Sequence, residues 1–181
     1  MIIVEGCDNT GKSTLVELLL RRHSKLVLGP KRVGPPEDKQ TFIDEIWETL
    51  SNAERLTNVV FDRLYFSELV YGRVLRGKPF ISYAEEKMID QVLRYYQPLI
   101  IYCYQDPAII RETFAERDQL PGEDKIEEIL NEYTNVFLPW ANYRDFHIYD
   151  YRNPLSVAKI MGRVKEYVKS RVEHELFWGR N

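Results

Sequence analysis

A short glycine-rich segment near the N-terminus constrains the fold of this chain more than any other feature. Residues 6–14 read GCDNTGKST and fit the pattern GxxxxGKS/T. The apolar run 2–4 precedes this segment, and the helix-like, leucine-rich run 15–20 follows it. A strand, a glycine-rich turn and a helix in this order are typical of a phosphate-binding loop, so the sequence predicts binding of a nucleoside triphosphate rather than an ordinary glycine turn.

The residue types of this loop match the parts of a triphosphate. Glycines let backbone N–H groups close round the β-phosphate, Lys12 spans the β- and γ-phosphates, and the Ser13 hydroxyl ligates Mg²⁺. The predicted cofactors are therefore Mg²⁺ and ATP as phosphoryl donor. The predicted ATP-binding residues in the loop are Gly6, Asn9, Thr10, Gly11, Lys12, Ser13 and Thr14.

Length and composition indicate one globular domain. The chain has 181 residues, 44% of them hydrophobic and 29% charged, and no apolar run long enough for a membrane span. Cys7 and Cys103 are expected to be reduced thiols, and the three histidines lack metal-ligand spacing. Without a leader sequence we expect a cytoplasmic location. The net charge of −3 favours small substrates without excluding DNA.

Short apolar runs alternate with segments of helical period, which predicts an α/β fold of the P-loop NTPase class. The expected strands are 2–4, 26–28, 59–61, 99–104 and 146–149. The expected helical stripes lie within 43–50, 66–74, 88–93, 126–137 and 157–168. We therefore predict a five-stranded parallel sheet with helices on both faces, and one P-loop domain over residues 1–181.

Two loops and one strand end are expected to face the phosphate loop. The run 59–63 reads VVFDR, so Asp62 ends a buried strand beside the predicted Mg²⁺, where it holds a metal-bound water or orients the nucleophile; the alternative is a helix cap. Arg63 is a predicted bidentate clamp for an acceptor phosphate. In the glycine- and proline-rich loop 29–36, Lys31 and Arg32 are acceptor-side candidates or simply solvated charges.

These two motifs carry a resemblance to a known family. VEGCD at 4–8 before GKST, together with Asp62 and Arg63 after an apolar strand, resembles the thymidylate kinase family and its deoxynucleoside kinase relatives. The resemblance implies that Asp8 reaches the deoxyribose 3′-hydroxyl and that Arg63 binds the acceptor phosphate. Residues 62–72 are similar to phage-type thymidylate kinase-like proteins, which adds Tyr71 as an acceptor contact and implies the host cytoplasm for a phage-encoded chain.

Three departures from that family leave the acceptor open. Cellular thymidylate kinases carry an Arg-Glu-Pro-Gly-Gly loop after the second strand, where this chain has residues 29–36. Only one helical stretch fits before Asp62, so the arginine that reads the thymine is missing or replaced. One class of these enzymes also has a catalytic arginine at the position of Asn9. The base-reading apparatus is therefore absent or rebuilt.

A predicted lid, residues 111–124, follows the fourth strand. The stretch 106–122 resembles the lid of nucleoside monophosphate kinases, with Arg111 and Arg117 as candidates to deliver positive charge to the transferring phosphoryl group; a solvated surface helix is the alternative. After the last strand, Arg152 or Tyr151 is expected to pack on adenine as in related kinases, unless both are plain turn residues.

The resemblance implies a kinase for a thymidine-like deoxynucleotide, dTMP or a 5-modified dUMP. One alternative is phosphorylation of the hydroxymethyl group of 5-hydroxymethyluracil in DNA; others are a deoxynucleoside kinase and an ATPase or switch module. A hydroxyl acceptor needs a proton acceptor, for which Asp62, Asp8 and Glu5 are candidates. A homodimer is a further expectation, since relatives often dimerise, although no stripe of the sequence identifies an interface.

Overall fold

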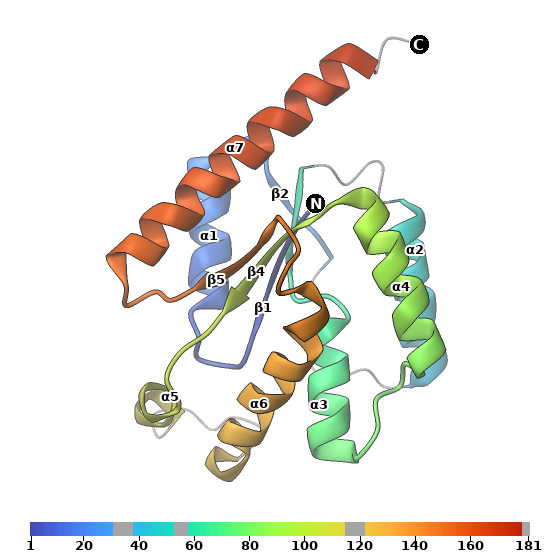
Figure 1. Cartoon of the computed structure of the whole chain (residues 1–181), viewed down its shortest axis with the longest axis vertical. Coiled ribbons are helices and arrows are strands. Elements are labelled where there is room, and N and C mark those ends of the chain that lie inside the picture. The colour runs from blue at the N-terminus through green and yellow to red at the C-terminus, as the bar shows by residue number, and fades with distance from the viewer. Residues whose placement is uncertain (31–37, 53–57, 115–121, 179–181) are drawn as a thin grey trace.

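Five parallel strands form the centre of the molecule, and helices cover both faces of the sheet (Figure 1). The computed structural model describes residues 1–30, 38–52, 58–114 and 122–178. The strands are β1 (Ile2–Gly6), β2 (Val27–Leu28), β3 (Val59–Asp62), β4 (Leu99–Cys103) and β5 (Phe146–Tyr149), in the spatial order β2-β3-β1-β4-β5. Each predicted strand is confirmed, with its ends shifted by at most two residues.

The helices divide between the two faces as the sequence predicts. They are α1 (Lys12–Arg22), α2 (Lys39–Ser51), α3 (Phe66–Arg76), α4 (Tyr83–Tyr96), α5 (Pro107–Phe114), α6 (Ile126–Phe137) and α7 (Pro154–Trp178), with short 3-10 helices η2 (Glu123–Lys125) and η3 (Leu138–Trp140). Helices α1 and α7 pack on one face; α2, α3, α4 and α6 pack on the other (Figure 1). Helix α5 lies at one end of the sheet.

The central strand shows why the strand sequences are apolar throughout. Ile2 and Val4 point into the core formed with α1 and α7, whereas Ile3 points into the core formed with the other helices. All three side chains are completely buried. A strand covered on both faces buries consecutive residues, so an unbroken apolar run rather than an alternating one is the expected pattern.

Local sequence fixes where two of the helices begin. Asp38 precedes α2 and accepts a hydrogen bond from the backbone N–H of Thr41 at 2.9 Å. Ser82 precedes α4 and forms a reciprocal capping box with Glu85. Such caps pair N–H groups that the first helical turn leaves without partners. Lys39 at the start of α2 reaches Glu85 of α4 at 3.3 Å, so the starts of these two helices are joined.

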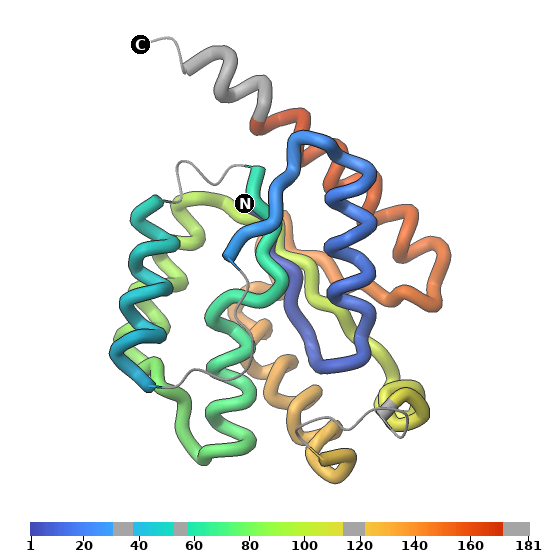
Figure 2. The backbone as a smooth tube through the Cα atoms, turned by 180° about the vertical axis from the view of Figure 1, so that it is seen from behind, coloured from blue at the N-terminus to red at the C-terminus, as the bar shows by residue number. Residues whose placement is uncertain are grey.

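The carboxyl ends of the parallel strands share one edge of the sheet, and the segments predicted to form the site follow them. The loop from β1 to α1 lies at this edge, as do α5 and the starts of α3 and α6 (Figure 2). In an open α/β sheet this edge is where ligands bind. Among the described helices, none has the length and apolar character that a membrane span requires.

The contact between β5 and α7 predicts a loss of stability in acid. Arg163 of α7 donates from Nε to Nε2 of His147 at 3.2 Å, which requires a neutral imidazole. Burial, then the positive charges of Arg163 and Lys159, hold the pKa of His147 below its ordinary value of 6.5, against a smaller opposite effect of Asp145. The unfolded chain therefore takes up a proton that the folded chain resists, and the free energy of unfolding falls as the pH drops below about 6.5.

We expect His147→Gln to remove part of this pH dependence, because glutamine does not titrate. Urea unfolding of both proteins, measured from neutral pH down to about pH 5, checks the expectation. His23 also has a lowered pKa, caused by burial and by Arg22 and Lys165, so some dependence remains in the variant. Identical slopes for the two proteins would contradict the assignment to His147.

Candidate active site

The phosphate loop needs glycine at both of its ends for steric reasons. Gly6 has φ 146°, and a Cβ there would lie 2.2 Å from the carbonyl oxygen of Cys103 in β4. Gly11 has φ 82°, and a Cβ there would lie 2.9 Å from the ring of Tyr151, which follows β5. Asn9, between them, also adopts a left-handed conformation, with φ 61°. The loop is therefore a strained turn held between two later segments of the chain.

Lys12 places its ammonium group inside this loop. Its Nζ donates to the carbonyl oxygen of Cys7 at 2.5 Å and lies 3.8 Å from Oδ1 of Asp8. Burial, followed by the positive charge of Arg63, lowers the pKa of Lys12 to about 8, and Asp8 partly offsets both effects. Phosphate oxygens could accept hydrogen bonds from this ammonium group in place of the carbonyl oxygen. The position of Lys12 therefore agrees with its predicted role of spanning the β- and γ-phosphates.

Ser13 and Asp62 meet at the start of α1, as the sequence predicts. The Ser13 hydroxyl donates to Oδ2 of Asp62 at 3.0 Å, although the two residues come from different elements. Mg²⁺ in nucleotide sites is held by one or two protein oxygens, with phosphates and water as its other ligands. A hydroxyl and a carboxylate side by side at a phosphate loop fit that requirement.

Arg63 occupies an unusual backbone position at the junction between β3 and α3. Its φ is 76°, and its backbone N–H donates to the carbonyl oxygen of Val4 at 2.9 Å. Its guanidinium group forms a salt bridge with Asp8 and lies over the ring of Tyr71, 5.2 Å from the ring centroid. The Tyr71 hydroxyl donates to the other oxygen of Asp8 at 3.1 Å. We call Asp8, Arg63 and Tyr71 the acceptor cluster.

A second layer of side chains, Glu5, Ser67 and Tyr133, supports the acceptor cluster from the interior of the protein. Glu5 is completely buried and accepts hydrogen bonds from the backbone N–H of Leu64 at 2.7 Å and from the hydroxyl of Ser67 at 2.5 Å. Burial raises the pKa of Glu5, and the positive charge of Arg63 opposes this effect. Because Glu5 has no exposed surface, whereas Asp8 is partly exposed, Glu5 is out of reach of a substrate hydroxyl. Of the three predicted proton acceptors, Asp8 and Asp62 remain.

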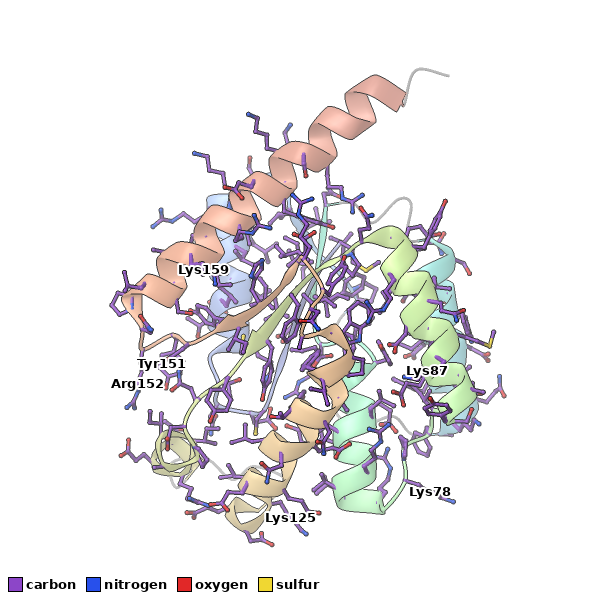
Figure 3. All side chains as sticks on the ribbon, viewed as in Figure 1. Lys78, Lys87, Lys125, Tyr151, Arg152 and Lys159 are labelled. Carbon is purple, nitrogen blue, oxygen red and sulfur yellow. The ribbon has the colours of Figure 1, made fainter. Side chains whose placement is uncertain are left out.

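The turn after β5 lies beside the phosphate loop. Asp150 accepts from the buried Gln105 side chain and from the backbone N–H of Arg152, the latter at 2.8 Å. Tyr151 packs on Gly11, and Nη2 of Arg152 lies 3.6 Å from Glu112 of α5. Figure 3 shows Tyr151 and Arg152 together at the start of α7. The structure thus places both residues near the loop, and their contact with adenine stays a prediction.

The structure describes only part of the predicted lid. Arg111 of α5 pairs with Glu127 of α6 at 2.5 Å and lies 3.9 Å from Glu123 of η2. In this arrangement the guanidinium group contacts carboxylates of the neighbouring helices. Arg117, Lys31 and Arg32 lie outside the described residues. The catalytic roles predicted for Arg111 and Arg117 therefore remain predictions.

Sequence reasoning missed two hydroxyl groups in the second layer. Ser67 receives a hydrogen bond from Nη1 of Arg63 at 3.0 Å, and Tyr133 of α6 donates to the carbonyl oxygen of Gly6 at 3.0 Å. Ser67 lies only four residues after Arg63, so its closeness in the sequence could have identified it, although Arg63 itself precedes α3. No local pattern connects Tyr133 to the loop, because the two are far apart in the sequence.

Comparisons with known proteins agree with this fold. No model of a known protein family matches the chain. The SPbeta prophage-derived uncharacterized protein YorR of Bacillus subtilis strain 168 is 26% identical over 139 residues, which are 75% of this chain and 81% of YorR. Its crystal structure in complex with phosphorylated GDP is similar, with a TM-score of 0.65, 21% identity and coverage of 91% of this chain and 95% of YorR.

Deoxyadenosine kinase from M. mycoides with bound dATP is similar as well. Its TM-score is 0.61 at 17% identity, and the match covers 91% of this chain and 98% of the kinase. The same kinase with bound dCTP matches with a TM-score of 0.60. The predicted fold class is therefore confirmed: the chain has the α/β fold of deoxynucleoside kinase-like P-loop proteins.

The lowered pKa of Lys12 predicts the pH dependence of nucleotide binding. A triphosphate attracts the charged ammonium form, whereas above about pH 8 the free protein increasingly carries a neutral amine. We therefore expect the affinity for Mg²⁺ and ATP to fall above about pH 8, by at most about tenfold per pH unit. Calorimetric titrations between about pH 7 and pH 9.5 measure this.

Lys12→Met is the control, since methionine cannot titrate and its weak residual binding should not vary with pH in this range. The Cys7 thiol, whose pKa burial raises to about 11, stays neutral over the same range. An affinity of the native protein that is constant up to about pH 9.5 would contradict the role assigned to Lys12.

Proposed function

We propose that this protein is a Mg²⁺- and ATP-dependent phosphotransferase that acts on a thymidine-like deoxynucleotide, dTMP or a 5-modified dUMP. One observation carries the proposal: Lys12, whose buried ammonium group lies 3.8 Å from Asp8 of the acceptor cluster, is followed directly by Ser13, whose hydroxyl donates to Asp62. A donor site and an acceptor site thus share one cation. The solved structures of similar fold, a deoxyadenosine kinase with dATP and YorR with phosphorylated GDP, support a nucleotide substrate.

The donor half of the site holds the triphosphate. Backbone N–H groups of the loop and the start of α1 bind the β-phosphate, and Lys12 spans the β- and γ-phosphates. Ser13 and Asp62 would hold Mg²⁺, which neutralises charge that develops on the phosphate oxygens. Tyr151, which packs on Gly11, and its neighbour Arg152 would contact the adenine.

The acceptor half would position a nucleotide whose phosphate is already anionic. Arg63 binds this phosphate, Asp8 accepts from a sugar hydroxyl, and Tyr71 orients Asp8 through its 3.1 Å hydrogen bond. An acceptor phosphate oxygen attacks the γ-phosphorus, the bond from that phosphorus to the β–γ bridging oxygen breaks, and ADP leaves with the electron pair. Such an acceptor needs positioning and charge stabilisation rather than a strong base.

Asp8 also favours a second candidate function, transfer to a hydroxyl group. Its Oδ1 lies 3.8 Å from Lys12 Nζ, so a carboxylate is close to where the transferring phosphate would be held. A carboxylate in this place can take the proton of an attacking hydroxyl. The acceptor would then be a deoxynucleoside or the hydroxymethyl group of 5-hydroxymethyluracil in DNA.

Assays with single acceptors test the proposal. The protein is incubated with labelled ATP, Mg²⁺ and, one at a time, dTMP, 5-hydroxymethyl-dUMP, thymidine or hydroxymethylated DNA. We expect transfer to dTMP or 5-hydroxymethyl-dUMP, and a loss of about 10³-fold or more in kcat/KM on Lys12→Met, because the shared cation is removed. Transfer to DNA alone, or to thymidine alone, would replace the leading proposal by the second. Rapid ATP hydrolysis that no acceptor alters would indicate an ATPase or switch module.

Arg111→Ala tests the lid in the same assay. If Arg111 leaves Glu127 and reaches the transferring phosphate, kcat should fall by about 10³-fold, as for other transition-state arginines. Lys125→Ala is the matched control, because Lys125 is also an exposed cation near the start of α6, paired with Glu128 at 2.6 Å (Figure 3). A small loss of equal size in both variants would show that Arg111 serves only its surface ion pairs.

A further inference from the structure

We propose that Tyr133 is a positioning residue, whose hydroxyl fixes the phosphate loop and the acceptor arginine relative to each other. The inference rests on the proposed function and deepens it. Tyr133 lies in α6, and no part of its side chain is exposed. It belongs to neither the donor residues nor the acceptor cluster, yet its hydroxyl reaches both halves of the site.

The contacts of this hydroxyl come from three separate segments. It donates to the carbonyl oxygen of Gly6 at 3.0 Å, at the first glycine of the phosphate loop. It accepts from Nη1 of Arg63 at 3.4 Å, and it lies 3.0 Å from the hydroxyl of Ser67. One oxygen atom thus contacts the end of β1, the junction after β3 and the first turn of α3.

The hydrogens of the Ser67 and Tyr133 hydroxyl groups determine how these contacts are arranged. The Ser67 hydroxyl donates to Oε2 of Glu5, and the Tyr133 hydroxyl donates to Gly6, so both hydroxyl hydrogens are used. Arg63 then supplies the donor for both oxygens, because its Nη1 faces Ser67 at 3.0 Å and Tyr133 at 3.4 Å. The guanidinium group is held from this side by two neutral oxygens, while Asp8 holds it from the other.

The ring of Tyr133 gives the hydroxyl a fixed place. It stacks on Tyr102 of β4 with 5.5 Å between centroids and on Phe137 at 6.1 Å, and it forms a T-shaped pair with Tyr71 at 6.3 Å. Aromatic rings packed on three sides have little rotational freedom. The position of the hydroxyl is therefore set by the sheet and by α6 together.

A fixed distance between donor and acceptor groups matters for phosphoryl transfer. A misplacement of about 1 Å can cost roughly 10²-fold in rate, because the reacting atoms must be close and in line. The Tyr133 hydroxyl is the point where the start of the phosphate loop and Arg63 contact one group. Since α6 begins directly after η2, this contact also connects the site to the helix that follows the predicted lid.

Tyr102 provides a matched control. It is buried in the same stack, 4% exposed, and its hydroxyl has no hydrogen-bond partner among the residues that the structure describes. Removing either hydroxyl changes the core by one oxygen atom and preserves the ring. Only at Tyr133 does the change break hydrogen bonds to the site.

The experiment compares Tyr133→Phe, Tyr102→Phe and the native protein. For Tyr133→Phe we expect a fall of about tenfold or more in kcat/KM for the acceptor, with the Kd for Mg²⁺ and ATP changed by less than about threefold, because the loop amides that bind phosphate follow Gly6. Tyr102→Phe should stay within about twofold of the native protein in both quantities. Thermal melting confirms that each variant is folded at the assay temperature.

Two results would overturn the inference. One is a Tyr133→Phe variant with the acceptor kinetics of Tyr102→Phe. The other is a loss of ATP affinity as large as the loss of transfer, as expected if Tyr133 only stabilises the loop. If Tyr133→Phe does not fold, Ser67→Ala interrupts the same network from α3 and is held to the same two criteria.

An assay of the native protein tests the proposed function independently of the comparison between variants. A native protein that binds ATP but phosphorylates no acceptor would refute that proposal. The comparison of Tyr133→Phe with Tyr102→Phe then uses the slow hydrolysis of ATP by water, with the same tenfold expectation. Equal hydrolysis by the two variants would overturn the inference in that case.

Discussion

The site at the carboxyl edge of the sheet depends on how two cations, the buried Lys12 and the partly buried Arg63, are kept close together. Lys12 and Arg63 repel each other, and burial adds to the cost of charging Lys12. Asp8 lies between them, in contact with Arg63 and 3.8 Å from the ammonium group, so one carboxylate screens both charges. The Cys7 carbonyl completes the arrangement. Protein oxygens thus hold both cations at the place where phosphate oxygens could bind them.

Two residues of the candidate site have strained backbone conformations. Asn9 and Arg63 both have positive φ, which costs about 1–3 kcal/mol at each non-glycine position unless the surroundings enforce it. At Arg63 the enforcing contacts are the hydrogen bonds that Val4 and Glu5 accept from two successive N–H groups after β3. The buried Glu5 carboxylate therefore acts indirectly: it holds the turn that aims the arginine into the site.

The sequence allowed the donor half of the site to be predicted more fully than the acceptor half. The phosphate loop is contiguous, and Asp62 ends a strand whose parallel neighbour ends at the loop, so the contact with Ser13 follows from topology. The network of Glu5, Ser67 and Tyr133 depends on the rotation of α3 and α6 about their axes, which apolar periodicity fixes only within tens of degrees.

The packing of Tyr151 on Gly11 has a consequence for biosynthesis. The first strand occupies the middle of the sheet, but its neighbour β4 is translated about midway through the chain, and the turn that supports Gly11 follows only after β5. A nascent polypeptide therefore lacks the β4 contact of this loop until residue 103 has emerged, and the Tyr151 contact until residue 151 has emerged. The proposed nucleotide could then bind a complete loop only after all five strands have emerged, and its binding would stabilise the assembled sheet by mass action.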